Sequence, residues 1–187
     1  RSYQSFITEK YIRMSGMKKT FENTNDAKKA LEEVKPLTAG KYDGTDYEFK
    51  HRAHTRSING SVTYIVNDKR EPHQDVVLYI HGGAWFQDPL DNHFDFIDQL
   101  AGELDARVIM PVYPKVPHRD YRTTFELLKN IYQKEILEVE NPQHMTIMGD
   151  SAGGQIALSF AQYLKKETPL PQPGHIVMLS PVLDATF

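Results

Sequence analysis

The 187-residue chain contains no cysteine, which excludes disulfide bonds and thiolate metal sites. It has no apolar run long enough to span a bilayer, and no signal peptide is visible. The formal net charge is only −3, so the chain carries no basic field for nucleic acid or an anionic membrane. The lack of cysteine suits a reducing compartment. We therefore expect a cytoplasmic protein with no transmembrane segment and no nucleic-acid partner.

The chain also lacks a phosphate-binding glycine loop and a pattern that predicts a metal site. His51 and His54 are three apart in an expected strand, so they would face opposite sides of a sheet. His93, with Asp91 and Asp95, lies at an expected helix start, where charge is normally solvated. Neither set offers converging ligands. We predict no metal and no cofactor.

Residues 1–40 are predicted to form a helical segment. Apolar residues from Tyr3 to Met14 recur at helical spacing, and a second helix is expected from an N-cap at Thr24 or Asn25 to Pro36. The segment is either a peripheral helical pair packed on the core or part of a cap over a pocket.

Residues 41–187 are predicted to form one α/β core. Alternation in residues 47–53 and 62–66 around an Asn59-Gly60 turn predicts an antiparallel hairpin. Further strands are expected at 76–80, 107–113, 144–148 and 175–180, separated by helices that begin near Asp91, Asp120 and Ser151. Alternating strands and helices favour a mostly parallel sheet, with antiparallel first strands and helices on both faces.

A serine between glycines lies where one strand pattern gives way to a helix pattern. Gly149 is two residues before Ser151 and Gly153 is two residues after it. This spacing fits the G-x-S-x-G nucleophile elbow, whose tight turn leaves no room for side chains at the two glycine positions. The turn lifts the serine hydroxyl out of the sheet, and the amide of Ala152 points to the same place. Ser151 is therefore the predicted nucleophile. The alternative is a glycine-rich turn with a capping serine.

A second glycine motif, YIHGGAW, completes an apolar run that predicts a buried strand. Glycines let backbone N–H groups approach a ligand closely. We predict that the amides of Gly82, Gly83 and Ala152 form an oxyanion hole. The alternative is an ordinary tight turn. Trp85 and Phe86 follow at once, and they either line a small substrate pocket or pack at the edge of the core.

With these motifs in this order, the chain resembles the hormone-sensitive lipase-like esterases of the α/β-hydrolase fold. HGGAW resembles that family's His-Gly-Gly-Gly loop, GDSAGG its elbow, PVYPKVP its Pro-rich segment and LSPVLD its Ser-Pro-x-x-Asp stretch. The resemblance implies that His81 supports the oxyanion loop and that residues 1–40 belong to a cap. Ala84 replaces a family glycine, which leaves the amides of Gly82 and Gly83 available.

The predicted catalytic triad is incomplete. In this fold the nucleophile, the acid and the histidine follow in that order, yet only His175 and Asp184 follow Ser151 as candidates. His175 would begin its strand at the end opposite the elbow. Asp184 would follow that strand at the correct end and is a weak candidate acid, although the resemblance implies a structural role. Six strands are expected where the full fold has eight. We expect the C-terminal strands, the acid and the histidine to lie outside this chain.

These observations predict a serine ester hydrolase of the carboxylesterase or lipase type, which acts through an acyl-enzyme on small or medium esters. Serine peptidases share the fold and the elbow, so amide cleavage is one alternative. A small-molecule binder that keeps the pocket without the base is another. Self-association into a homo-oligomer is possible on exposed sheet edges.

Overall fold

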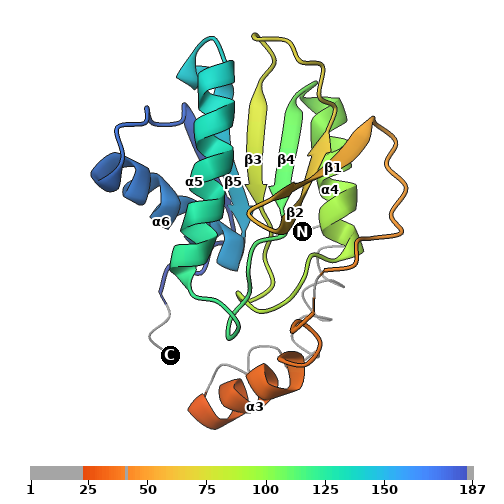
Figure 1. The fold of residues 1–187 in the computed structure, drawn as a ribbon, viewed down its shortest axis with the longest axis vertical. Coiled ribbons are helices and arrows are strands. Elements are labelled where there is room, and N and C mark those ends of the chain that lie inside the picture. Colours follow the sequence, from red (N-terminus) through yellow and green to blue (C-terminus); the bar gives the residue numbers. More distant parts are fainter. Residues whose placement is uncertain (1–22, 41, 185–187) are drawn as a thin grey trace, which may run out of the picture.

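The computed structural model describes residues 23–40 and 42–184. Its centre is a six-stranded sheet in the order β1-β2-β4-β3-β5-β6 (Figure 1). The strand β2 is antiparallel to both β1 and β4, whereas β4, β3, β5 and β6 run parallel. This confirms the predicted mostly parallel sheet with antiparallel first strands. The strands are β1 (Ala53–Ile58), β2 (Ser61–Val66), β3 (Val76–Ile80), β4 (Arg107–Pro111), β5 (Met145–Asp150) and β6 (His175–Leu179).

Helices cover both faces of the sheet because the central strands alternate their side chains between two cores. Val76 and Leu78 of β3 belong to a cluster with α5 and α6, whereas Val77 and Tyr79 belong to a second cluster with α4. All four side chains are buried, as expected for a strand with two covered faces. The helices are α3 (Thr24–Val34), α4 (Asp91–Glu103), α5 (Tyr121–Glu138) and α6 (Ala152–Glu167), with a short 3₁₀ turn, η1 (Pro142–His144).

The hairpin is present, but its first strand begins later than predicted. Asn59 and Gly60 have φ angles of 49° and 79°, as a two-residue hairpin turn requires. Residues 47–52 are not a strand. Their alternating apolar side chains and their backbone amides contact helix α4 instead. The Tyr47 and Phe94 rings stack with centroids 6.0 Å apart. The backbone amide of Lys50 donates to Asp98 of α4 instead of to a neighbouring strand, at 2.8 Å.

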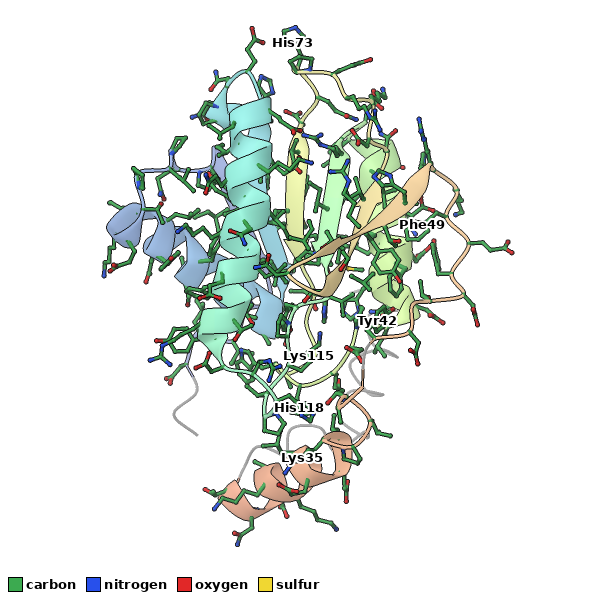
Figure 2. All side chains as sticks on the ribbon, in the orientation of Figure 1. Lys35, Tyr42, Phe49, His73, Lys115 and His118 are labelled. Carbon is green, nitrogen blue, oxygen red and sulfur yellow. The ribbon has the colours of Figure 1, made fainter. Side chains whose placement is uncertain are left out.

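The N-terminal segment is described only in part, since residues 1–22, and with them the first expected helix, lie outside the described residues. The N-cap of α3 is Asn23, one or two residues before the predicted Thr24 or Asn25, and its side chain accepts from the amide of Asp26. Figure 1 shows α3 set apart from the sheet. The ring of His118 lies 3.0 Å from the carbonyl oxygen of Lys35 at its end (Figure 2). The boundary between a cap and a core at residue 40 stays a prediction.

Candidate active site

Ser151 lies at the turn between β5 and α6, where backbone of α6, of β6 and of the segment after β6 holds it. Its φ of 49° and ψ of −120° are sparsely populated for a non-glycine residue, at a cost of roughly 1–3 kcal/mol. Its N–H donates to the carbonyl of Leu179 at 2.9 Å, and its own carbonyl accepts from Gln155 and Val182 at 3.2 Å each. These bonds to α6 and to the end of β6 maintain the strained turn.

The two glycines around the serine are required by two different close contacts. A Cβ on Gly149 would lie 2.8 Å from the amide nitrogen of Gly154, and closer still to the carbonyl oxygen of Gly153. A Cβ on Gly153 would lie 2.7 Å from the carbonyl oxygen of His81, and closer still to that of Ile80. The first contact lets β5 turn directly into α6. The second lets the start of α6 pack against the end of β3.

Two consecutive peptide planes after β3 are fixed by side chains. The His81 carbonyl accepts from the Tyr113 hydroxyl at 3.1 Å, and the Gly82 N–H of the same plane donates to Asp150 at 2.8 Å. In the next plane, Nδ1 of His81 donates to the Gly82 carbonyl at 2.6 Å. The carbonyl and N–H of a trans peptide point in opposite directions. The imidazole therefore turns the Gly83 N–H away from itself.

The loop then folds back through left-handed backbone at three successive residues. Gly83, Ala84 and Trp85 have φ angles of 116°, 50° and 66°. The Gly83 carbonyl accepts from the amide of Gln87 at 2.9 Å, which closes the turn. The indole N–H of Trp85 donates to the side chain of Gln155 at 3.1 Å. The glycine loop is thereby tied to the first turn of α6, beside the serine.

Asp150 is the acceptor that organises this region. Its Oδ1 accepts from the hydroxyl of Tyr79 at 2.6 Å and from the amide of Gly82 at 2.8 Å, while its Oδ2 lies 3.6 Å from Nε2 of His93. Burial raises the pKa of Asp150, but its contacts with His93, Tyr79 and Gly82 outweigh burial, and the net shift is downward. Gly82, which the sequence predicts as an oxyanion donor, thus directs its amide to this carboxylate.

His81 is neutral and inaccessible in this arrangement. Its side chain is fully buried and stacks on the ring of Tyr113, with centroids 4.5 Å apart. Burial, with a smaller contribution from the charge of Lys115, holds the pKa of His81 well below its usual range. A buried imidazole cannot reach a substrate, so this geometry suits support of the loop and not the role of a base.

An apolar cavity of about 500 Å³ opens beside the elbow, between the loop after β4 and the helices α5 and α6. Trp85, Phe125, Ile156, Gln155 and Ser159 contribute to its lining. Its size is typical of a small-molecule site. Gln155 is one helical turn beyond the predicted nucleophile, so the cavity begins close to the serine. Trp85 therefore lines a cavity, one of the two roles that the sequence left open for it.

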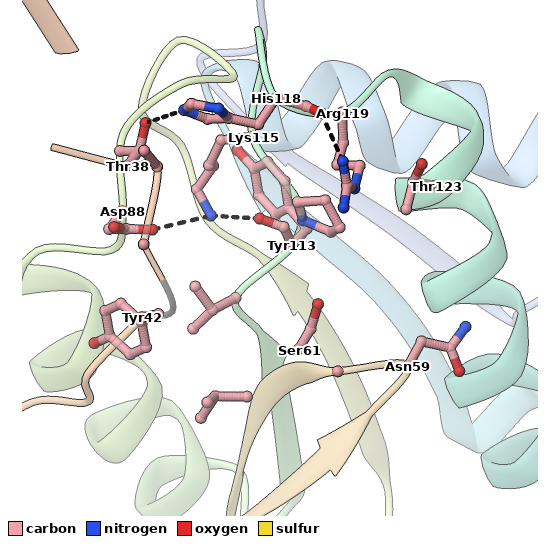
Figure 3. A pocket seen from close by; sticks show the side chains of 16 residues that line it. Thr38, Tyr42, Asn59, Ser61, Asp88, Tyr113, Lys115, His118, Arg119 and Thr123 are labelled. Atoms are coloured by element: carbon pink, nitrogen blue, oxygen red, sulfur yellow. Dashed lines mark hydrogen bonds and ion pairs between the residues drawn. The ribbon is translucent and has the colours of Figure 1, made fainter. Parts of the chain in front are cut away.

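A second cavity, of about 480 Å³, has a lining of polar and apolar residues and shares Tyr113, Pro114 and Arg119 with the first (Figure 3). Nζ of Lys115 donates to the carbonyl of Tyr113 at 2.5 Å and lies 3.3 Å from Oδ1 of Asp88. Burial lowers the pKa of Lys115 to about 8, although Asp88 opposes the shift. The Lys115 ammonium group therefore has both a carboxylate and a carbonyl partner within this cavity.

Of the other two sequence-predicted candidates, His175 lies far from the serine. His175 pairs with Thr146 at the start of β5, which is the end of the sheet opposite Ser151. Asp184 follows β6 on the side of Ser151, and its role as an acid stays a prediction. Among residues 23–40 and 42–184, no group of three or more acidic, histidine or cysteine side chains could hold a metal ion. No helix within the same residues is long and apolar enough to cross a membrane.

Sequence reasoning missed two residues that contribute to the site. His93 was expected to be solvated, but only 6 % of it is exposed. It lies four residues before Ile97 on the buried side of α4, and this spacing was the available signal. Tyr79 was read only as a buried strand residue. A hydroxyl inside an apolar strand needs a hydrogen-bond partner, which here is Asp150.

Comparison with known proteins agrees with this architecture. A family model described as "alpha/beta hydrolase fold" matches residues 77–187, more than half of the chain. An esterase of Acinetobacter venetianus is 32 % identical over 112 residues, which are 60 % of this chain and 37 % of the relative. An ethyl acetate hydrolase of Pseudomonas putida is 28 % identical over 172 residues, which are 87 % of this chain and 53 % of the relative.

Solved structures show the same fold. A crystal structure from Staphylococcus aureus has a TM-score of 0.76 at 28 % identity, covering 89 % of this chain and 56 % of that one. An esterase from the bacterial hormone-sensitive lipase family has a TM-score of 0.63 at 19 % identity, covering 85 % of this chain and 58 % of that one. The chain thus spans about half the length of these proteins, or less. Because the family model, the sheet order and the strand–serine–helix turn agree, the chain belongs to the α/β-hydrolase family.

Proposed function

We propose that the intact gene product is a serine ester hydrolase in which Ser151 is the nucleophile. The observation that carries the proposal is the strained backbone of Ser151 at the start of α6, held by three backbone hydrogen bonds. Such strain persists only where the surrounding structure enforces it, and it clusters at functional sites. Similarity to proteins named esterase and ethyl acetate hydrolase supports an ester substrate.

The oxyanion is assigned to the amides of Gly83 and Ala152. Ala152 is the first residue of α6, so its N–H has no acceptor within the helix. The Gly83 N–H is turned away from the imidazole of His81, which holds the other end of the same peptide plane. We assign the Gly82 N–H to anchoring the loop and not to binding the oxyanion, because it donates to Asp150. An oxyanion donor of this kind typically lowers the barrier by about 3 kcal/mol.

The reaction proceeds in two balanced steps. The Oγ of Ser151 bonds to the ester carbonyl carbon, the bond to the alcohol oxygen breaks, and the serine proton passes through a base to the leaving alcohol. Water then attacks the acyl-enzyme, which releases the acid and restores the serine. His81 is buried and His175 lies at the far end of the sheet. We assign the base to a residue outside residues 23–40 and 42–184.

The apolar cavity lined by Trp85 and Phe125 is assigned to an acyl or alcohol group of the ester. Seven of its twelve lining residues are aromatic or aliphatic, and such a lining suits an uncharged organic group. Two properties expected from the sequence, a cytoplasmic location and self-association, stay predictions.

The test is covalent labelling of the intact gene product with a fluorophosphonate. The parent should react, and Ser151→Ala should not. Ser57→Ala is the matched control, because it removes an exposed hydroxyl from β1, outside the site, and it should still react. Equal labelling of the parent and Ser151→Ala would refute the assignment. Labelling combined with faster cleavage of an aminoacyl anilide than of a short nitrophenyl ester would indicate a peptidase, and failure of the parent to label would indicate a binder.

A further inference from the structure

His93 has both ring nitrogens directed at neighbours, although it lies outside both glycine motifs. It occupies the first turn of α4 and is 6 % exposed. Its Nδ1 lies 2.9 Å from the backbone nitrogen of Leu90, the N-cap residue of that helix. Its Nε2 lies 3.6 Å from Oδ2 of Asp150, the carboxylate that holds Gly82. One side chain therefore joins a helix terminus to the support of the oxyanion loop.

The contact with Leu90 fixes the tautomer of His93. A backbone N–H can only donate, so Nδ1 must offer its lone pair. The proton of the neutral ring is then on Nε2, on the side of Asp150. A second proton on Nδ1 would oppose the Leu90 N–H donor to donor and would break the helix cap. His93 is consequently a neutral ring whose single N–H is aimed at the carboxylate.

The groups around the ring are consistent with a neutral donor. The His81 ring lies edge-on to His93, with centroids 5.6 Å apart, and it is itself neutral. Asp150 approaches from β5 and already accepts two hydrogen bonds on Oδ1, from Tyr79 and Gly82. Its Oδ2 is the oxygen next to His93. An N–H on this side keeps the carboxylate turned so that Oδ1 faces the loop.

We propose that His93 is a positioning residue for the oxyanion hole, acting through Asp150 by the polar contact of its Nε2 with Oδ2. By orienting the Asp150 carboxylate it holds the Gly82 N–H, and so fixes the peptide plane directly before the one that carries the Gly83 N–H. It does not touch the substrate. The inference rests on the proposed function, because its kinetic consequence requires that the Gly83 amide stabilises an oxyanion.

Two substitutions separate the helix cap from the positioning contact. The amide oxygen of His93→Asn can reach the place of Nδ1 and accept from Leu90, but its side chain is too short to replace Nε2. The longer amide of His93→Gln can present an N–H where Nε2 was. If His93 only capped the helix, His93→Asn should be the better tolerated substitution, because Asn can still accept from Leu90. A positioning His93 predicts that Gln keeps turnover and Asn loses it.

The experiment measures kcat and KM for p-nitrophenyl acetate, and the thermal midpoint, in the intact gene product. We expect His93→Asn to lower kcat about tenfold with KM within about twofold, which is the pattern of an interaction made in the transition state. His93→Gln should keep kcat within about threefold of the parent, even where its midpoint falls. His51→Asn is the matched control, because His51 binds Asp98 on the same helix at 2.8 Å but lies outside this network. It should leave kcat unchanged.

The outcomes are distinguishable from failure of the proposed function. An unchanged kcat in His93→Asn would overturn the positioning role. So would losses of kcat in both variants that merely parallel the fall in their thermal midpoints. Nitrogen NMR of the His93 ring reads the tautomer without any turnover, and a proton on Nδ1 would overturn the inference. Loss of fluorophosphonate labelling in the parent would instead refute the proposed function.

Discussion

Replacing Gly153 by alanine tests whether the start of α6 and the end of β3 are packed backbone to backbone. The new Cβ would lie 2.7 Å from the carbonyl oxygen of His81 and closer to that of Ile80. Neither oxygen can swing aside, because each belongs to the strand or the loop. The two elements must therefore separate by roughly 0.5–1 Å, at a cost of about 1–3 kcal/mol for an overpacked core. The better helix propensity of alanine offsets less than about 1 kcal/mol of this loss of stability.

The kinetic effect should exceed the loss of stability. Ala152 moves with α6, whereas Gly83 moves with the loop after β3, so the separation opens the proposed oxyanion hole. A misplacement of about 1 Å can lower the rate about 100-fold. The assay compares the fluorophosphonate labelling rate and the urea midpoint of Gly153→Ala with those of Gly40→Ala, whose new Cβ would meet nothing within 4 Å. Labelling within threefold of the parent, at an unchanged midpoint, would refute the packing argument.

Three further predictions concern the carboxylate, the cavity and the sheet edge. The folded state lowers the pKa of Asp150, so its contribution to stability is present above about pH 4 and is lost as the pH falls through the folded value. Asp150→Asn should therefore be about 1–3 kcal/mol less stable at pH 7 by urea unfolding, with a difference that closes in acid; a pH-independent difference would contradict this. Ser159→Phe should fill the apolar cavity and reduce kcat/KM for p-nitrophenyl hexanoate about tenfold relative to the acetate; a parallel change for both esters would show that the acyl chain lies elsewhere. Val177 is 37 % exposed on β6, the edge strand of the described sheet, so we expect the 187-residue chain to self-associate through this edge. Val177→Lys should weaken the association and elute later from a sizing column. An unchanged elution volume would exclude pairing at this edge.

Much of the architecture could be predicted because its signals are local. The Asn59-Gly60 turn, the buried run of β3 and the strand–serine–helix order each depend on residues close together in the sequence. The glycine spacing around Ser151 also follows from the turn itself. The contact that requires Gly149 is with the backbone of Gly153, only four residues away. Sequence spacing alone was therefore sufficient to predict this part of the site.

What could not be predicted depends on partners far apart in the sequence. The alternation in residues 47–52 looked like a strand, but the amides of Lys50 and His51 find Asp98 of α4 instead. The fate of the Gly82 amide likewise depends on Asp150, 68 residues later. Periodicity reports which side of an element is apolar. It does not report which distant acceptor will be within reach of a particular N–H.

Three independent contacts join the serine to the proposed oxyanion loop. Asp150 immediately precedes Ser151 and binds Gly82 of the loop. The Trp85 side chain is bonded to Gln155, one turn into α6. The backbone of α6 at Gly153 leaves no space between itself and the end of β3. Oxyanion donors contribute most when they need no reorganisation as charge develops. A displacement of the loop alone would have to break all three contacts, so the fold itself supplies the preorganisation on which the proposed chemistry depends.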